Sequence, residues 1–171
     1  MTDAEDAVHQ EDNGSDHLFR TMARLAARVH SGGVDRGDRA ELRRMQPNGI
    51  PPAIFWQLTD KLGGNDQLWM TVLPLMVSHP HQSGARPGRV LARNGVKPAR
   101  VMRWLRRDKK SAWQEARRFL GPAGGAALDW GRFGVLLAAW DHPDVRRRFA
   151  REYFSEVHRR ERTSSSASGG A

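Results

Sequence analysis

Apolar side chains recur every three or four residues along most of the chain, and this spacing places them on one face of an α-helix. One such stripe near the N-terminus is Leu18, Met22, Leu25 and Val29. Another, near the C-terminus, is Val145, Phe149, Tyr153 and Val157. No stretch alternates apolar and polar residues for long enough to form a strand. The pattern therefore predicts an all-α fold.

Glycine, proline and capping residues divide this pattern into about nine helices. Asp38, Ser111 and Asp129 stand where helix N-caps are expected, and Pro74 should kink the helix that contains it. We expect helices at about residues 16–30, 38–45, 52–62, 66–77, 87–93, 98–110, 111–120, 129–140 and 143–158.

The same pattern predicts two helical bundles, an N-terminal one over residues 16–78 and a C-terminal one over residues 89–160. Residues 79–88, with the sequence HPHQSGARPG, form the expected loop between them. Residues 1–15 are polar and acidic and show no periodicity, so we expect a disordered segment. Residues 161–171 are rich in Ser, Gly and Ala, which predicts a flexible tail.

Positive charge is unevenly distributed along the 171 residues, whose formal net charge is +9. The first 16 residues carry six acids and no Lys or Arg, so the remainder is more basic than the total indicates. A body this basic is typical of proteins that bind nucleic acid or another anionic surface. The acidic start does not resemble a signal peptide, and no apolar stretch is long enough to span a membrane. We therefore expect a cytoplasmic protein.

The densest positive charge lies between Arg86 and Leu120, where only Asp108 and Glu115 are acidic. On a helix that starts at Pro98, five cations fall within roughly 120° of one another, opposite an apolar face. These cations are Arg100, Arg103, Arg106, Arg107 and Lys110. A row of guanidinium groups matches the phosphates of a nucleic-acid backbone, although a merely solvated Arg-rich face is the alternative.

Other functional chemistry has little support in the sequence. There is no Cys, and His79 and His81 lie in a Gly/Pro-rich loop without further ligands, so we expect no metal site and no cofactor. No paired carboxylates or nucleotide-binding glycine motif occur past Asp16, so we expect no enzymatic activity. Trp104 adjoins the cationic stripe, where it is either core or a base-stacking residue. The other tryptophans are expected in the core: Trp56, Trp69, Trp113, Trp130 and Trp140.

Two functions fit a basic helical scaffold. The sequence RVLARNGVKPARVMRWLRR is similar to a helix-turn-helix, in which the second helix enters the major groove of DNA. That helix would present five cations and no Asn, Gln or Ser, a set that suits phosphates better than base edges. The other function is a sequence-independent binder that follows a nucleic-acid backbone within a larger assembly.

Several segments resemble one known family. They are GDRAELRRM at 37–45, RVMRWLRRD at 100–108, and LDWGRFGVLLAAWDHPDVRRRFAREYF at 128–154. The W-D-H-P step followed by an Arg-rich helix that ends in aromatic residues is the most specific of these features. In this order and spacing the segments are similar to the CasB family, the small subunit of the type I-E CRISPR Cascade complex.

This resemblance implies an all-α subunit without enzymatic activity that helps an RNA-guided complex hold the target and displaced DNA strands and so stabilises the R-loop. The implied partners are DNA, the guide RNA with its backbone subunits, the large subunit that reads the PAM, and a second copy of the chain. The basic residues that match the family's DNA-binding face are Arg39, Arg43, Arg44, Arg100, Arg103, Arg106, Arg107, Lys110, Arg117, Arg118, Arg147 and Arg151. For the arginines between 146 and 151, contact with a neighbouring subunit or plain solvation is the alternative.

Overall fold

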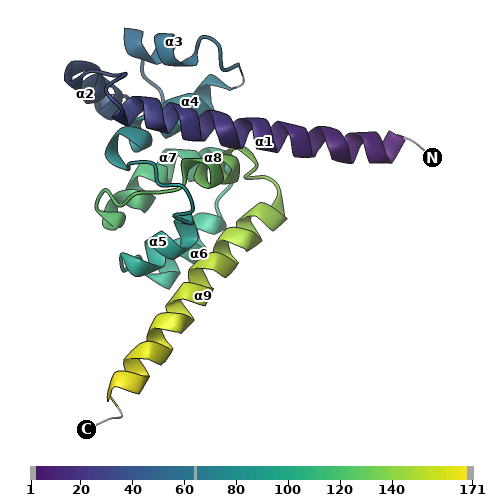
Figure 1. Ribbon diagram of the computed structural model, residues 1–171, viewed down its shortest axis with the longest axis vertical. Coiled ribbons are helices and arrows are strands. Elements are labelled where there is room, and N and C mark those ends of the chain that lie inside the picture. Colours follow the sequence, from purple (N-terminus) through teal and green to yellow (C-terminus); the bar gives the residue numbers. More distant parts are fainter. Residues whose placement is uncertain (1–2, 64, 169–171) are drawn as a thin grey trace.

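The structure, a computed structural model, describes residues 3–63 and 65–168, with side chains described over residues 14–63 and 65–165. In that part of the chain there are nine α-helices and one short 3-10 helix, and no strand (Figure 1). The all-α prediction is confirmed. Within the same ranges, no helix combines the length and apolar character needed to cross a membrane.

The first four helices lie together at one end of the molecule, and the later ones form the rest of the body (Figure 1). The first four are α1 (Asp3–His30), α2 (Arg36–Arg44), α3 (Ala53–Thr59) and α4 (Asp66–Ser78). The later elements are α5 (Pro87–Arg93), α6 (Pro98–Leu105), α7 (Lys109–Leu120), the 3-10 helix η1 (Gly121–Ala123), α8 (Trp130–Ala138) and α9 (Pro143–Ser168).

Aspartates cap three of the helices, and two of these caps differ from the prediction. Asp35 rather than Asp38 caps α2, accepting a bond of 2.8 Å from the Asp38 N–H. Asp108 rather than Ser111 caps α7, because its carboxylate accepts the Ser111 N–H at 3.0 Å. Asp129 caps α8 as predicted. Since each cap satisfies a backbone donor that has no partner inside the helix, it fixes where the helix begins.

The two terminal helices are longer than predicted. α1 begins at Asp3 instead of near residue 16, and α9 continues to Ser168 instead of ending near residue 158. The expected disorder of residues 1–15 and flexibility of residues 161–171 stay predictions, and residues 1–2 and 169–171 lie outside the part that the structure describes.

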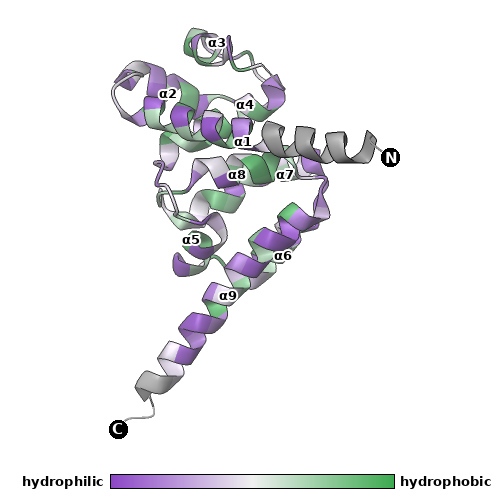
Figure 2. Cartoon of the chain, turned by 45° about the vertical axis from the view of Figure 1, so that its right-hand side comes forward, coloured by the Kyte–Doolittle hydropathy of each residue, from purple (hydrophilic) through white to green (hydrophobic). Residues whose placement is uncertain are grey.

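The buried side chains of both predicted bundles form one continuous hydrophobic cluster. α4 is buried from Leu68 to Val77, with Pro74 inside the helix, and Figure 2 shows hydrophobic positions on the helices in the middle of the body. α8 packs closely on α1, because a Cβ added to Gly131 would lie 2.6 Å from Phe19 and one added to Gly134 would lie 2.5 Å from Met22. The division into two bundles stays a prediction, and both bundles share this core.

Four of the five tryptophans expected in the core are buried there: Trp69, Trp113, Trp130 and Trp140. The prediction for Trp56 was wrong, since 49% of this residue is exposed. α3 is only a short helix, and its buried side chains are those of Ile54, Phe55, Leu58 and Thr59. Trp56 therefore lies on the outer side of α3, where its ring forms a T-shaped contact with the Phe55 ring at a centroid distance of 5.0 Å.

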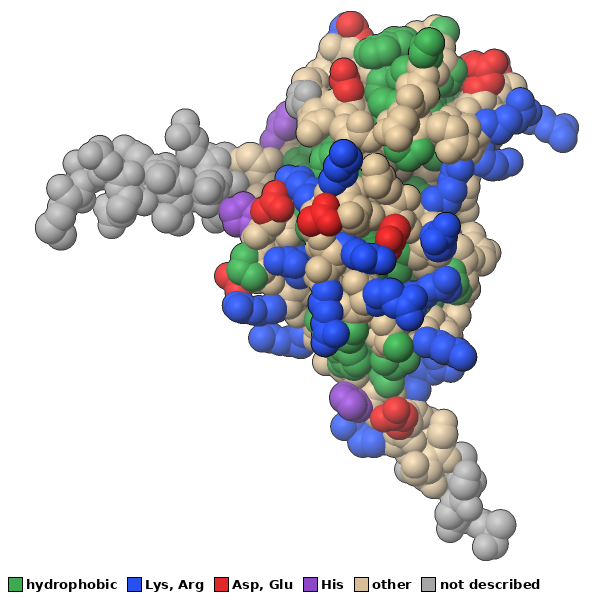
Figure 3. All heavy atoms as spheres, turned by 180° about the vertical axis from the view of Figure 1, so that it is seen from behind, with side chains coloured by type: hydrophobic (Ala, Val, Ile, Leu, Met, Phe, Trp, Pro, Cys, Tyr) green, Lys and Arg blue, Asp and Glu red, His purple; other side chains and the backbone are tan. Residues whose placement is uncertain are grey.

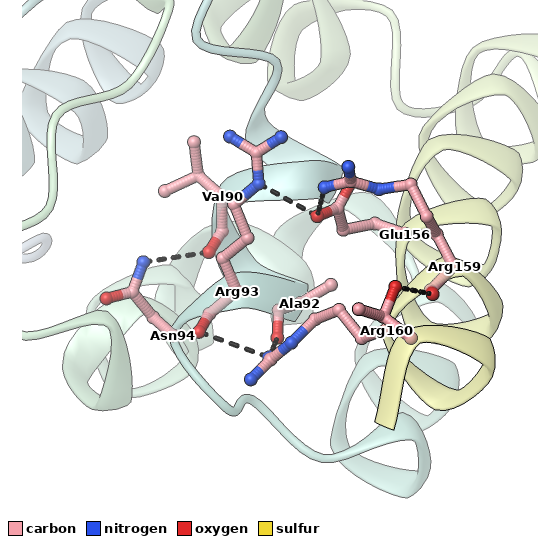
Figure 4. Close-up of polar contacts among 8 residues, drawn as sticks. Val90, Ala92, Arg93, Asn94, Glu156, Arg159 and Arg160 are labelled. Atoms are coloured by element: carbon pink, nitrogen blue, oxygen red, sulfur yellow. Dashed lines mark hydrogen bonds and ion pairs between the residues drawn. The ribbon is translucent and has the colours of Figure 1, made fainter. Parts of the chain in front are cut away.

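α9 lies against α5, and one buried carboxylate joins the two helices (Figure 4). Glu156, 3% exposed, accepts hydrogen bonds from Arg159 at 2.5 Å and from Arg93 at 2.8 Å. One turn further on, Arg160 donates to the carbonyl oxygens of Ala92 and Arg93. The bonds from Arg93 to Glu156 and from Arg160 to α5 connect residues more than 60 positions apart and hold α9 in one orientation on the body.

The Glu156 pair should make stability depend on acid pH. The hydrogen bonds from Arg159 and Arg93 lower the pKa of Glu156 from 4.5 to about 2. Because this pKa is lower in the folded state, the stabilisation is fully present above about pH 4.5 and is lost as the pH falls towards about 2. We expect the difference in melting temperature between the native protein and Glu156→Gln to shrink steadily over that interval. A difference that stays constant from about pH 5 to about pH 2 would contradict this role.

Candidate nucleic-acid interface

The predicted cationic helix is in fact two helices joined by a sharp turn. α6 ends at Leu105, so Arg106 and Arg107 lie in the turn and Lys110 belongs to the first turn of α7. The reason is the cap at Asp108, which starts a new helix three residues after the old one ends. The prediction of one stripe along one helix was therefore wrong, although its members remain neighbours across the turn.

Trp104 fixes the angle between α6 and α7. Its indole N–H donates to the carbonyl of Ala112 at 3.0 Å, and its ring stacks on Phe119 of α7 with centroids 3.9 Å apart. Trp140 supports the turn by donating to the Arg107 carbonyl at 2.9 Å. Since only 2% of Trp104 is exposed, its ring is core and is not available to stack on a base.

Side chains from α6, the turn and α7 line a hollow of about 100 Å³, named here the α6–α7 hollow. Trp104 and Phe119 contribute its apolar lining, and Glu115 is its one acid. Four arginines complete it: Arg100, Arg103, Arg107 and Arg118. The structure thus brings residues from two helices of the predicted site around one point.

Most cations of the predicted binding site have no neighbouring acid that neutralises their charge. Arg107 pairs with Glu115, with 3.1 Å between Nη2 and Oε1. Among the side chains that the structure describes, no carboxylate lies within 4.0 Å of the charged groups of the following residues. They are Arg43, Arg44, Arg100, Arg103, Arg106, Lys110, Arg117 and Arg118. All eight are exposed, so their charge faces solvent.

α2 adds its arginines to the same region, because Arg117 of α7 donates to the carbonyl oxygen of Arg43. Arg43 and Arg44 are exposed, whereas Arg39 is half-buried and donates to the Asp35 carbonyl at the start of its own helix. We call the eight unneutralised cations together with Arg107 the basic surface. Figure 3 shows one face of the molecule on which Lys and Arg side chains greatly outnumber acids.

The α9 arginines differ from this group. Arg147 pairs with Asp144 at 2.9 Å, and Arg151 is exposed. Arg146 has a structural role that the sequence did not indicate, since it donates to the Leu105 carbonyl at 3.0 Å and lies 5.9 Å from the Trp140 ring centroid. This role arises from contacts between segments that are far apart in the sequence, so the local sequence around Arg146 does not reveal it.

The two histidines of the H-x-H string hold the loop after α4 in place. The His79 ring bonds to the Ala126 carbonyl at 3.1 Å, and His81 accepts the Trp130 N–H at 3.2 Å. Burial lowers the pKa of His79, which favours its neutral form. Within the described residues, no three His, Asp or Glu side chains are grouped as metal ligands.

Comparison with solved structures shows the same fold in a protein of known assembly. A chain in the crystal structure of E. coli Cascade bound to a PAM-containing dsDNA target superimposes with a TM-score of 0.60 and 22% sequence identity. The match covers 83% of this chain and 95% of that one. A search of curated proteins finds no match.

The sequence itself matches a family model over residues 38–154, which is more than half of the chain. The matched region runs from α2 to the middle of α9 and includes the whole basic surface. The model describes the CRISPR-associated protein Cse2, another name for CasB, so the resemblance noted in the sequence is confirmed. The chain belongs to the family of CRISPR-associated protein Cse2.

Proposed function

We propose that this chain is a non-catalytic subunit of a Cascade-type CRISPR surveillance complex that holds the target and displaced DNA strands without reading their sequence. The observation that carries the proposal is the basic surface, whose exposed arginines come from α2, α6 and α7 and lack partner acids among the described side chains. Like charges this close destabilise the free protein, and an anionic polymer would relieve that repulsion.

The chemistry of the surface suits phosphates. It consists of Arg and Lys, which bind the backbone through charge, and the nearby aromatic ring of Trp104 is buried and cannot stack on bases. Phosphate contacts position a nucleic acid but carry no sequence information. Strand exchange between guide RNA and DNA is nearly balanced in energy, so even modest backbone contacts favour the R-loop.

The proposal includes the partners of such a subunit. They are the target and displaced DNA strands, the guide RNA with the backbone subunits, the large subunit that reads the PAM, and a second copy of the chain. Family membership and the fold shared with a chain of E. coli Cascade support this assembly. Arg39, Arg147 and Arg151 complete the proposed DNA-binding set.

Replacing Arg100, Arg103 and Arg118 together by Ala is expected to weaken binding of single-stranded DNA by about tenfold to a hundredfold at low salt. Three lost phosphate contacts should also make the log–log salt dependence shallower by about 2. The measurement is fluorescence anisotropy with labelled oligonucleotides of several unrelated sequences, over a range of salt concentrations. The loss should be the same for every sequence.

The matched control removes the same charge elsewhere, by replacing Arg24, Arg28 and Lys61, which lie on α1 and after α3. This control should bind almost as tightly as the native chain. An equal loss in both triple variants would mean that net charge alone drives binding. A loss confined to one sequence would instead support a helix-turn-helix regulator.

A further inference from the structure

We propose that the α6–α7 hollow is a discrete seat for one phosphodiester of the bound strand, and that Glu115 occupies it in the free protein by pairing with Arg107. This inference rests on the proposed function and specifies how the basic surface holds a backbone. In this proposal one defined site binds a phosphate, rather than positive charge spread evenly over the surface. An acidic residue, Glu115, also takes part in nucleic-acid binding.

The seat is formed by parts that cannot move independently. Its apolar lining is the Trp104–Phe119 stack, with ring centroids 3.9 Å apart and an angle of 13° between the rings, and both residues are buried. The Trp104–Ala112 and Trp140–Arg107 hydrogen bonds fix the helices and the turn that carry the arginines. A guanidinium group held on such a support loses less entropy when it binds a phosphate oxygen.

The size of the hollow suits a small anion. Its volume of about 100 Å³ compares with roughly 30 Å³ for one water molecule in the liquid, so it accepts a group of a few heavy atoms such as a phosphate. The buried Trp104–Phe119 stack leaves no ring free to receive a base. Arginines reach this space from both helices, which lets two or more guanidinium groups share the oxygens of one phosphate.

Glu115 is the one carboxylate that lines the hollow, and it contacts Arg107 in the way that a bound phosphate would. Its Oε1 lies 3.1 Å from Nη2 of Arg107 and its Oε2 lies 3.3 Å from Nε, a two-point contact of the kind that a phosphate also makes. The side chains of Arg107 and Glu115 are 45% and 35% exposed, so solvent screens the pair and an incoming phosphate can separate it. Arg100, Arg103 and Arg118 remain unneutralised around it.

Glu115→Gln tests the seat, because it removes the competing charge and keeps the shape of the side chain. We expect binding of single-stranded DNA to become about threefold to tenfold tighter at low salt, with a salt dependence steeper by about 0.7, the value for one added phosphate contact. The control is Glu161→Gln, which removes the same charge from an exposed site on α9 where the neighbour is His158. It should change the affinity by less than about twofold.

A second measurement separates one seat from diffuse attraction. The probe is thymidylyl-thymidine, which has a single phosphodiester, titrated into the protein while the arginine Nε–H signals are followed by NMR. Saturable shifts should be confined to the arginines of the hollow and should be larger in Glu115→Gln. Equal shifts at Arg147 and Arg151, or equal tightening by Glu115→Gln and Glu161→Gln, would overturn the seat.

The seat and the proposed function fail in different ways. If the triple Arg variant loses affinity while Glu115→Gln leaves it unchanged, the basic surface binds nucleic acid but has no discrete seat. If neither the triple variant nor Glu115→Gln changes the affinity, both proposals are wrong.

Discussion

Replacing Trp104 by Ala is expected to lower the free energy of unfolding by about 3–5 kcal/mol, the range measured when a buried Trp is truncated. Only 2% of Trp104 is exposed, and three further rings, those of Phe133, Trp140 and Phe149, lie within 6.1 Å of its own in addition to the Phe119 stack. The change would leave a cavity among these rings and would remove the hydrogen bond to Ala112.

Urea denaturation followed by circular dichroism measures this loss, and Trp56→Ala is its matched control. The control deletes the same side chain from a position that is 49% exposed, so it should cost less than about 1 kcal/mol. Similar losses in the two variants would mean that Trp104 is not the centre of the aromatic cluster.

We also expect Trp104→Ala to weaken DNA binding below its melting temperature, because the angle between α6 and α7 depends on this ring.

Periodicity predicted the helices well where one face of a helix is buried and the other is not. The stripe of Val145, Phe149, Tyr153 and Val157 belongs to α9, and α5 has the bounds that Pro87 and Asn94 indicated. Periodicity could not decide the break after Leu105, since Arg, Lys and Asp are all tolerated within a helix. Whether Asp108 is an interior residue or a cap depends on the contact of Trp104 with the next helix, which is a tertiary interaction.

The candidate site, like the fold, could be predicted only in part from the sequence. The sequence indicated which residues carry the charge, because Arg100, Arg103 and Arg118 fall outside the apolar faces of their helices. It could not indicate the α6–α7 hollow, because this forms only when two helices meet at the angle set by Trp104 and Phe119. Nor could it indicate that Glu115 faces Arg107, since the two are eight positions apart and Arg107 lies in the turn before α7.

Gly88→Ala is expected to destabilise the protein by about 3 kcal/mol, at the upper end of the range for overpacked sites. α5 and α9 approach so closely at Gly88 that an added Cβ would lie 2.8 Å from the Phe149 carbonyl oxygen and 2.9 Å from the Tyr153 nitrogen. Both are main-chain atoms of α9, so no rotation of a side chain can relieve the contact and the whole helix must move. This cost should outweigh the gain of about 1 kcal/mol that Ala normally brings inside a helix.

Gly121→Ala provides a control with the opposite sign. Gly121 has helical backbone angles and no atom within 4 Å of an added Cβ, so the substitution should be neutral or should stabilise the protein by up to about 1 kcal/mol. Comparison of the melting curves of the two variants then separates the effect of the close contact at Gly88 from the general effect of replacing Gly by Ala. Because a displaced α9 would also separate Glu156 from Arg93, Gly88→Ala should weaken the acid-pH dependence described for Glu156. A Gly88→Ala protein that is as stable as Gly121→Ala, with that pH dependence intact, would mean that α9 does not depend on this close approach.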